Sequence, residues 1–175
     1  MAKTLCLLRH AKSSWADPAL DDFDRPLNQR GRSSMTPLGL YIGEKKLFPD
    51  SILCSSAQRT RETLGLLLPW LRGEAAVRIE RGLYLASADE LLMRLRRAED
   101  EASCLLMIGH NPGLEALAGM MAGSAGDAFA STAMQEKFPT AALAVLDFDV
   151  SHWADVTPGK GELRAFVSPK LLSRA

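Results

Sequence analysis

Short apolar runs alternate with longer segments of helical character along most of this chain. The apolar runs have the length of β-strands and lie at residues 4–8, 51–54, 77–79 and 104–108. Strands that alternate with helices are typical of α/β domains, in which helices cover both faces of a mostly parallel sheet. The sequence therefore predicts a three-layer α/β/α sandwich.

Capping residues and leucine periodicity predict helices between these runs. The predicted helices cover residues 28–46, 57–71, 87–98 and 112–122. Asn28 can cap the first of them, which we expect to restart at Pro37 with Thr36 as a second N-cap. The third begins with a capping box, because Ser87 precedes Glu90 by three residues.

The C-terminal part of the chain is predicted to complete the sheet with a hairpin. Residues 123–139 have the composition of a loop with at most one turn of helix. Residues 141–148 and 162–167 are predicted strands, and Pro158-Gly159 supplies a turn between them. Because hairpin strands are antiparallel, we expect a mixed, mostly parallel sheet. The 175 residues are enough for one domain with its own core, predicted over residues 1–175.

The overall charge argues against a nucleic-acid binder. The chain has 21 basic and 21 acidic residues, whereas proteins that bind nucleic acid usually have a basic excess. No apolar stretch approaches the roughly 20 residues that a membrane helix needs. The apolar run near the N-terminus ends at Arg9, so it is not expected to act as a signal peptide. We therefore expect no nucleic-acid partner and no membrane partner.

The cysteines indicate a reducing compartment. Cys6, Cys54 and Cys104 all lie in predicted strands, where a free thiol usually behaves as a small buried apolar group. An odd number of cysteines without paired spacing argues against a disulfide framework and against a zinc site. The expected location is the cytoplasm.

Two predicted strands end immediately before a histidine. Arg9 and His10 follow the first strand, and His110 follows the fourth. Arg59 lies in the first turn of the helix that follows the second strand. If these strands are neighbours, their carboxyl ends share one edge of the sheet, where α/β proteins bind ligands. Guanidinium groups and helix N-termini at one point favour an anion, and arginine binds phosphate oxygens in pairs. The sequence therefore predicts a phosphate site.

These groups are suited to phosphoryl transfer. A neutral imidazole is a competent nucleophile at neutral pH. One histidine can therefore attack phosphorus while the second histidine and the two arginines stabilise the charge on the equatorial oxygens. A carboxylic acid would then protonate the leaving oxygen.

The motifs around these residues resemble a known family. They are Arg9-His10, Ser55-Ser56, Arg59-Thr60 with Thr63, and Gly109-His110. Together they resemble the histidine phosphatase superfamily (phosphoglycerate-mutase-like). The small size, the run from Leu8 to Trp15 and the Asp-Arg-Pro-Leu-Asn segment that precedes Gly31 are most similar to its SixA branch, the phosphohistidine phosphatases. The resemblance covers about residues 3–148.

The resemblance implies a role for each matching residue. His10 matches the family nucleophile, and Arg9, Arg59 and His110 match the residues that bind phosphate and stabilise the pentavalent transition state. It implies a mixed sheet flanked by helices, with no metal and no organic cofactor. The chain departs from the family pattern at Ala11, where a glycine is usual, and at Lys12 and Ala16.

The family's larger members insert a helical cap over the site, and this chain has no room for one after the third strand. An open site suits a phosphate displayed on a protein, so the expected function is a phosphatase acting on protein phosphohistidine or a related exposed phosphorylated substrate. The alternatives are a small-molecule phosphomonoesterase, a phosphomutase, or a phosphate-binding module without turnover. The expected partner is a phosphorylated protein or a small phosphorylated molecule.

The general acid is left open by the sequence. Glu80 lies near the loop after the third strand, where many relatives place a carboxylate. Asp21, Asp22 and Asp24 lie in the loop after the first strand. A phosphohistidine has a good leaving group, so an acid could also be unnecessary. Ser13 is a further candidate for phosphate binding, through its hydroxyl or its backbone.

Overall fold

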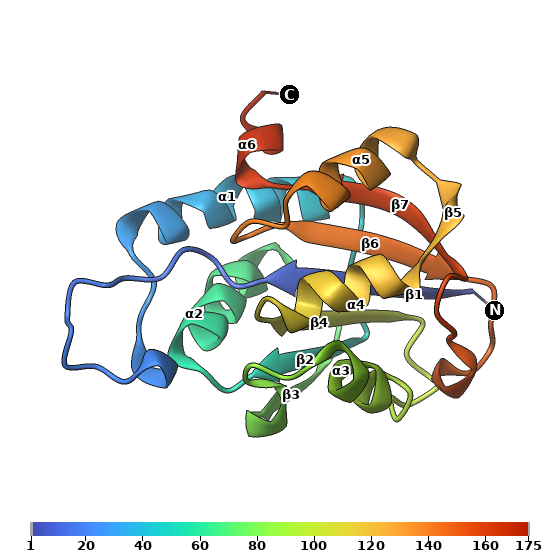
Figure 1. The fold of residues 1–175 in the computed structure, drawn as a ribbon, viewed down its shortest axis with the longest axis horizontal. Coiled ribbons are helices and arrows are strands. Elements are labelled where there is room, and N and C mark those ends of the chain that lie inside the picture. The colour runs from blue at the N-terminus through green and yellow to red at the C-terminus, as the bar shows by residue number, and fades with distance from the viewer. Residues whose placement is uncertain (1, 175) are drawn as a thin grey trace.

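The computed structural model describes residues 2–174, so the first and last residues of the predicted domain lie outside it. Within this range, a seven-stranded sheet has the order β3-β2-β4-β1-β6-β7-β5 (Figure 1). The strands are β1 (Lys3–Arg9), β2 (Ser51–Ser55), β3 (Ala76–Glu80), β4 (Cys104–Gly109), β5 (Ala122–Gly126), β6 (Leu143–Phe148) and β7 (Gly161–Val167). Only β6 runs antiparallel to its neighbours, so the sheet is mixed and mostly parallel, as predicted.

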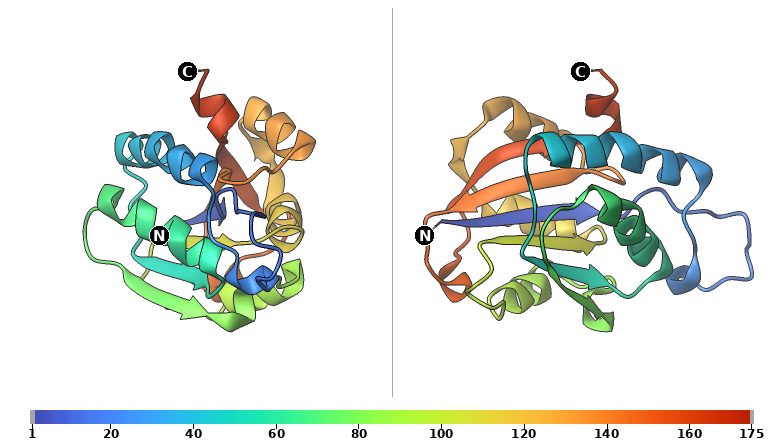
Figure 2. Two further views of the ribbon diagram at one scale, coloured as in Figure 1. Left: turned by 90° about the vertical axis from the view of Figure 1, so that its left-hand side faces the viewer. Right: turned by 180° about the vertical axis from the view of Figure 1, so that it is seen from behind.

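Helices cover both faces of this sheet (Figure 2). The helices are α1 (Gln29–Glu44), α2 (Gln58–Leu67), α3 (Ala88–Leu95), α4 (Gly113–Met121), α5 (Ala128–Glu136) and α6 (Pro169–Leu172). In β1, Cys6 and Leu8 belong to the core cluster under α1 and α2, whereas Leu5 and Leu7 belong to the cluster under α3 and α4. Because strand side chains alternate between faces, a fully apolar strand such as β1 is buried on both sides. The predicted three-layer α/β/α sandwich is confirmed.

The first helix confirms its predicted cap and corrects its predicted break. Asn28 is the N-cap of α1, and its side chain accepts a hydrogen bond from the backbone N–H of Gly31 at 2.8 Å. The expected restart at Pro37 is wrong, because α1 runs through that residue without interruption. Met35, Leu38 and Ile42 are buried on one side of α1, and this continuous apolar contact holds the helix across the hydrogen bond that proline cannot make.

The loop predicted over 123–139 is wrong for most of its length. Residues 122–126 form β5, which pairs with β7, and Asp127 caps α5 by accepting from the N–H of Ala130. The pattern-based prediction failed because the apolar side chains of β5 are two alanines, which give no strand-like pattern of large apolar residues. Its glycines instead permit a close backbone approach: a Cβ on Gly126 would lie 2.6 Å from the carbonyl oxygen of Leu163.

The predicted start of the third helix and the predicted burial of two of the three cysteines are also observed. The Ser87–Glu90 capping box is present at the start of α3. Cys6 and Cys54 are buried as predicted, whereas Cys104 is only half-buried. In the part of the chain that the structure describes, no helix combines the length and apolar character needed to cross a membrane.

The sheet order brings the predicted site residues to one edge. β4 lies between β1 and β2, and all three strands are parallel. Arg9 pairs in register with Gly109, so His10 and His110 leave the sheet side by side. Residues 81–87 alone connect β3 to α3, which leaves no space for an inserted helical cap.

Candidate active site

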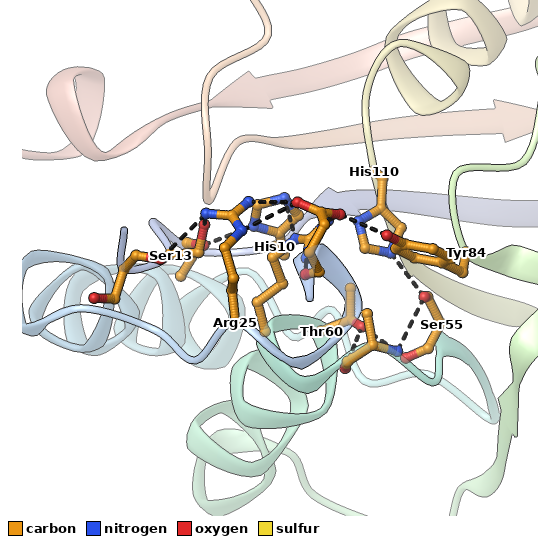
Figure 3. Close-up of polar contacts among 12 residues, drawn as sticks. His10, Ser13, Arg25, Ser55, Thr60, Tyr84 and His110 are labelled. Carbon is orange, nitrogen blue, oxygen red and sulfur yellow. Dashed lines mark hydrogen bonds and ion pairs between the residues drawn. The ribbon is translucent and has the colours of Figure 1, made fainter. Parts of the chain in front are cut away.

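A cavity of about 550 Å³ opens at the carboxyl ends of β1 and β4, beside the start of α2. Five of the predicted site residues line it: Arg9, His10, Ser13, Arg59 and His110. The close-up in Figure 3 shows several of these side chains gathered around one point. Segments that are far apart in the sequence therefore supply a single site, as expected from the strand order.

His10 is held in one tautomer by its two neighbours. Its Nδ1 lies 2.7 Å from the carbonyl oxygen of Ala11, and its Nε2 lies 3.3 Å from Nε of Arg59. A carbonyl can only accept and a guanidinium can only donate. Nδ1 therefore carries the proton, and the lone pair of Nε2 faces Arg59. Burial of the ring lowers the pKa of His10 to about 4, so the imidazole is neutral at neutral pH.

The loop that carries His10 is fastened to α2. The backbone N–H of Ala11 donates to Oγ1 of Thr63 at 3.0 Å, and that hydroxyl donates to the carbonyl oxygen of Arg59 at 2.7 Å. The nucleophile candidate and Arg59 are thus positioned by one shared set of hydrogen bonds. This explains why Thr63 belongs to the same motif as Arg59.

His110 lies directly beside His10. The two ring centroids are 5.3 Å apart, and Nε2 of His110 is 2.7 Å from Oγ of Ser55. Burial, followed by the charge that His10 carries when protonated and by the charge of Arg59, lowers the pKa of His110 to about 3. Among residues 2–174, no hydrogen-bond partner contacts its buried Nδ1.

The two lowered histidine pKa values predict a loss of stability in mild acid. Both folded pKa values lie below the ordinary 6.5, so between pH 6.5 and about 4 the unfolded chain binds protons that the folded chain does not. The contribution of the two neutral rings to the free energy of unfolding is therefore fully present above pH 6.5 and is lost as the pH falls toward 4. From pH 7 to pH 5, we expect the free energy of unfolding to fall by about 2 kcal/mol per histidine. Urea unfolding at both pH values measures this.

The matched variant for that measurement is His110→Gln, which removes one of the two titrating rings. Its drop in unfolding free energy from pH 7 to pH 5 should be about half that of the unsubstituted protein. Equal stability of the unsubstituted protein at the two pH values would contradict the assignment of neutral, buried histidines.

Arg59 is buried and makes a close contact that the sequence did not indicate. Its side chain is 3 % exposed, and its Nη2 forms an ion pair of 3.0 Å with Oδ2 of Asp22. Nη1 also donates to the backbone oxygen of Asp22 at 2.5 Å. Arg9 is oriented differently, since its Nη1 donates to the carbonyl oxygen of Phe138 at 3.0 Å. Both guanidinium groups reach the same cavity.

Arg25 is a third arginine of the cavity and was not among the predicted site residues. It is buried, and Nη1 donates to Oγ of Ser13 at 2.8 Å. Its guanidinium also pairs with Asp22 at 3.0 Å and lies 3.5 Å from the ring centroid of Trp15. The available signal was its place in the Asp-Arg-Pro-Leu-Asn segment. Ser13 lines the cavity and fixes Arg25 there.

Positive charge dominates the lining of the cavity. The cationic side chains are those of Arg9, Lys12, Arg25, Arg59 and Lys137. Among the described residues that line it, Asp22 is the single carboxylate. A concave surface with this excess attracts an anion such as a phosphoryl group.

Tyr84 joins the loop after β3 to the site and was also missed. Its hydroxyl donates to Oδ2 of Asp22 at 2.5 Å, and its ring meets the His110 ring edge-on with centroids 5.3 Å apart. Its signal in the sequence was weak, because a tyrosine in a loop has many possible roles. The contact places it between the carboxylate and the second histidine (Figure 3).

Of the candidate general acids, Asp22 lines the cavity and Glu80 does not. The structure does not bring Glu80 to the cavity: its carboxylate forms two hydrogen bonds of 2.7 and 2.8 Å with Arg94, which lower the pKa of Glu80. Of Asp21, Asp22 and Asp24, only Asp22 is among the described lining residues. Burial tends to raise the pKa of Asp22, but hydrogen bonds from Tyr84 and Arg59 lower it to about 2.

The chain is similar to known proteins in both sequence and fold. Residues 5–84 match the model of the histidine phosphatase superfamily (branch 1). The uncharacterised protein Rv1276c of Mycobacterium tuberculosis is 36% identical over 167 residues, which cover 93% of this chain and 100% of that protein.

Two solved structures have the same fold over nearly their whole length, and both are described as “putative phosphohistidine phosphatase SixA”. The protein from Nakamurella multipartitia has a TM-score of 0.83 and 30% identity, with 97% of each chain covered. The protein from Agrobacterium tumefaciens has a TM-score of 0.78 and 31% identity, with 95% of this chain and 98% of that chain covered. With the matching motifs at the cavity, these similarities show that the chain belongs to branch 1 of the histidine phosphatase superfamily.

Proposed function

We propose that this protein is a phosphatase that takes a phosphoryl group onto Nε2 of His10 and then releases it to water. The observation that carries the proposal is the state of His10: a neutral ring with its Nδ1 proton bound to Ala11 and its Nε2 lone pair beside Arg59. Nucleophilic attack on phosphorus requires this tautomer, because Nε2 must supply the electron pair.

The reaction proceeds in two displacements. In the first, Nε2 of His10 forms a bond to phosphorus while the bond to the leaving group breaks and the leaving group keeps its electron pair. In the second, water attacks phosphorus, inorganic phosphate leaves, and the electron pair returns to Nε2. Arg9, Arg59 and His110 line the cavity around His10 and stabilise the charge on the equatorial oxygens in both steps.

The favoured substrate is a phosphohistidine, or a related phosphoryl group, exposed on a protein. Residues 81–87 form a short connection rather than a cap, so a bulky carrier can approach the cavity. Trp15 and Leu85 line the cavity and remain 76% and 52% exposed, which leaves apolar surface available to a protein partner. The solved relatives described as SixA support the same substrate class. The three cysteines are free thiols, which favours a cytoplasmic location.

The alternatives differ in what they do with the phosphoryl group. A small-molecule phosphomonoesterase would turn over a generic phosphomonoester faster than a phosphohistidine protein. A phosphomutase would return the phosphoryl group to an acceptor hydroxyl, and a binding module would release no phosphate from either substrate. The test is to measure phosphate release from both substrates and to trap the acid-labile phosphoenzyme. We expect both substrates to label the protein, with higher kcat/KM for the phosphohistidine protein.

Asp22 is the carboxyl group best placed to act as general acid when the leaving group is poor. Without substrate it is an ionised partner of Arg59 and cannot donate a proton. A bound phosphoryl dianion would compete for Arg59 and repel the carboxylate, and both effects raise the pKa of Asp22. We expect Asp22→Asn to slow hydrolysis of an alkyl phosphate about a hundredfold. Hydrolysis of phosphohistidine, whose leaving group needs less protonation, should slow far less. Steady-state kcat with the two substrates measures this difference.

The matched control for that experiment is Glu80→Gln. Glu80 was the other candidate acid, and its carboxylate is bound to Arg94 outside the cavity. Its substitution should leave kcat for both substrates unchanged. If Glu80→Gln slowed alkyl phosphate hydrolysis and Asp22→Asn did not, the assignment of Asp22 would be wrong.

A further inference from the structure

Ser55 contacts the second histidine without lining the cavity itself. It is the last residue of β2 and is fully buried, and it is not among the residues that line the cavity. Its Oγ lies 2.7 Å from Nε2 of His110 (Figure 3). A neutral imidazole has one N–H and one lone pair. The direction of this hydrogen bond therefore decides which nitrogen of His110 carries the proton.

The hydrogen-bond inventory of Ser55 determines that direction. A serine hydroxyl has one proton to donate and can accept at its oxygen. Oγ of Ser55 already accepts from the backbone N–H of Ala57, at 3.4 Å. Among residues 2–174, Nε2 of His110 is the acceptor that its own proton can reach. If Nε2 carried the proton instead, the buried hydroxyl would be left without an acceptor, at a cost of about 1–3 kcal/mol.

The other ring nitrogen of His110, Nδ1, is available to form a hydrogen bond with a ligand. Nδ1 is buried, and none of the described residues forms a hydrogen bond with it. His110 itself is 3 % exposed and lines the cavity beside His10. An unpartnered polar atom in such a place requires a partner, and a phosphoryl oxygen is an acceptor. A protonated Nδ1 would donate to that oxygen, whereas an unprotonated Nδ1 would present a lone pair to it.

We propose that Ser55 is a positioning residue that holds His110 in the Nδ1–H tautomer, so that His110 donates a hydrogen bond to the transferring phosphoryl group. This inference deepens the proposed function and rests on it for the identity of the ligand. The two histidines then have the same tautomer for opposite purposes. His10 needs a free Nε2 lone pair to attack phosphorus, and His110 needs a proton on Nδ1 to stabilise the oxygens.

The tautomer can be measured without any turnover. Proton–nitrogen correlation spectra of the isotope-labelled protein distinguish a protonated ring nitrogen from an unprotonated one. The chain has three histidines, so His110→Gln assigns the signals by difference. We expect the proton of His110 on Nδ1 in the unsubstituted protein. A proton on Nε2 would overturn the inference, whatever the outcome of the activity assays for the proposed phosphatase.

Two serine variants make the test specific. Ser55→Ala should leave His110 free to populate both tautomers and should lower kcat on the order of tenfold, because the donor to phosphate is then present for part of the time. Ser56→Ala removes the neighbouring hydroxyl, which contacts no described hydrogen-bond partner, and should change neither the spectrum nor kcat. An unchanged His110 tautomer in Ser55→Ala would also overturn the inference.

A double substitution separates positioning from a general loss of packing. If Ser55 acts through His110, adding Ser55→Ala to His110→Gln should cost no further activity, because glutamine has no tautomers. Effects on kcat that multiply in the double variant would show that Ser55 acts independently of His110. Thermal unfolding of each variant identifies any change in kcat that comes from misfolding.

Discussion

His10→Ala is expected to abolish both phosphate release and the acid-labile label. The substitution removes the single atom, Nε2, that the proposed mechanism bonds to phosphorus. Arg9, Arg59 and His110 would still bind the substrate, but charge stabilisation alone leaves no covalent intermediate to form. We expect kcat to fall by at least about 10⁴-fold, by analogy with the loss of other enzymatic nucleophiles. Radiolabelled substrate, acid lability of the label and steady-state phosphate release provide the three measurements.

His152→Ala is the matched control for this variant. His152 is the third histidine, exposed, and paired with Asp100 at 2.8 Å away from the cavity. The His152→Ala variant should become phosphorylated and should release phosphate at the same rates as the unsubstituted protein. Normal turnover by His10→Ala would disprove the proposed nucleophile, and normal labelling without turnover would show that the label lies on another residue.

Arg59→Ala is expected to have the second largest effect. Arg59 contacts Nε2 of His10 and is buried at the wall of the cavity, where a lost charge cannot be replaced by mobile solvent ions. Its removal also takes away one of the two arginine partners of Asp22, so that this carboxylate carries less compensated negative charge beside the substrate. We expect a loss of about 2–5 kcal/mol of transition-state stabilisation, or roughly 30- to several-thousandfold in kcat/KM. Steady-state kinetics with the phosphohistidine protein measures it.

Arg61→Ala tests whether that loss is specific. Arg61 lies two residues further along α2, and its guanidinium contacts the backbone oxygen of Ser56 and the side chain of Gln58 on the exposed surface. This variant removes an arginine from the same helix without touching the cavity, so kcat/KM should not change. If Arg59→Ala and Arg61→Ala had the same activity, Arg59 would have no part in the transition state.

Asp22 compensates part of the positive charge inside the cavity. Asp22 pairs with both Arg25 and Arg59, and Tyr84 donates to the same carboxylate. Two buried guanidinium groups and a half-buried phenol thus share one anion, which partly offsets the cost of burying the guanidinium groups. A phosphoryl dianion carries more charge than Asp22 and can replace it as the partner of Arg59. Under the proposed function, we therefore expect binding to exchange one anion for another rather than to create a new ion pair.

Much of the fold could be predicted because the evidence for it is local. Leucine periodicity predicts α2, although the helix ends at Leu67 and not at residue 71, because Pro69 follows in a separate 3-10 turn. The Asn28 N-cap and the Ser87 capping box place the starts of α1 and α3. β5 could not be predicted in this way, since backbone proximity to β7 rather than side-chain pattern makes it a strand. Pro37 misled the prediction for a related reason: the packing of a whole helix face outweighed one local defect.

The residue types and their positions just after apolar runs were enough to indicate a phosphate site, because chain direction and sheet handedness put strand ends at a common edge. The amino-acid sequence by itself therefore determined His10, His110, Arg9 and Arg59 as a group. Only the tertiary structure showed that Glu80 forms an ion pair with Arg94, that Asp22 forms one with Arg59, and that Ser55 is hydrogen-bonded to His110. The strength of an ion pair or hydrogen bond depends on the distance between two atoms, and residues separated by tens of positions carry no local pattern that records this distance.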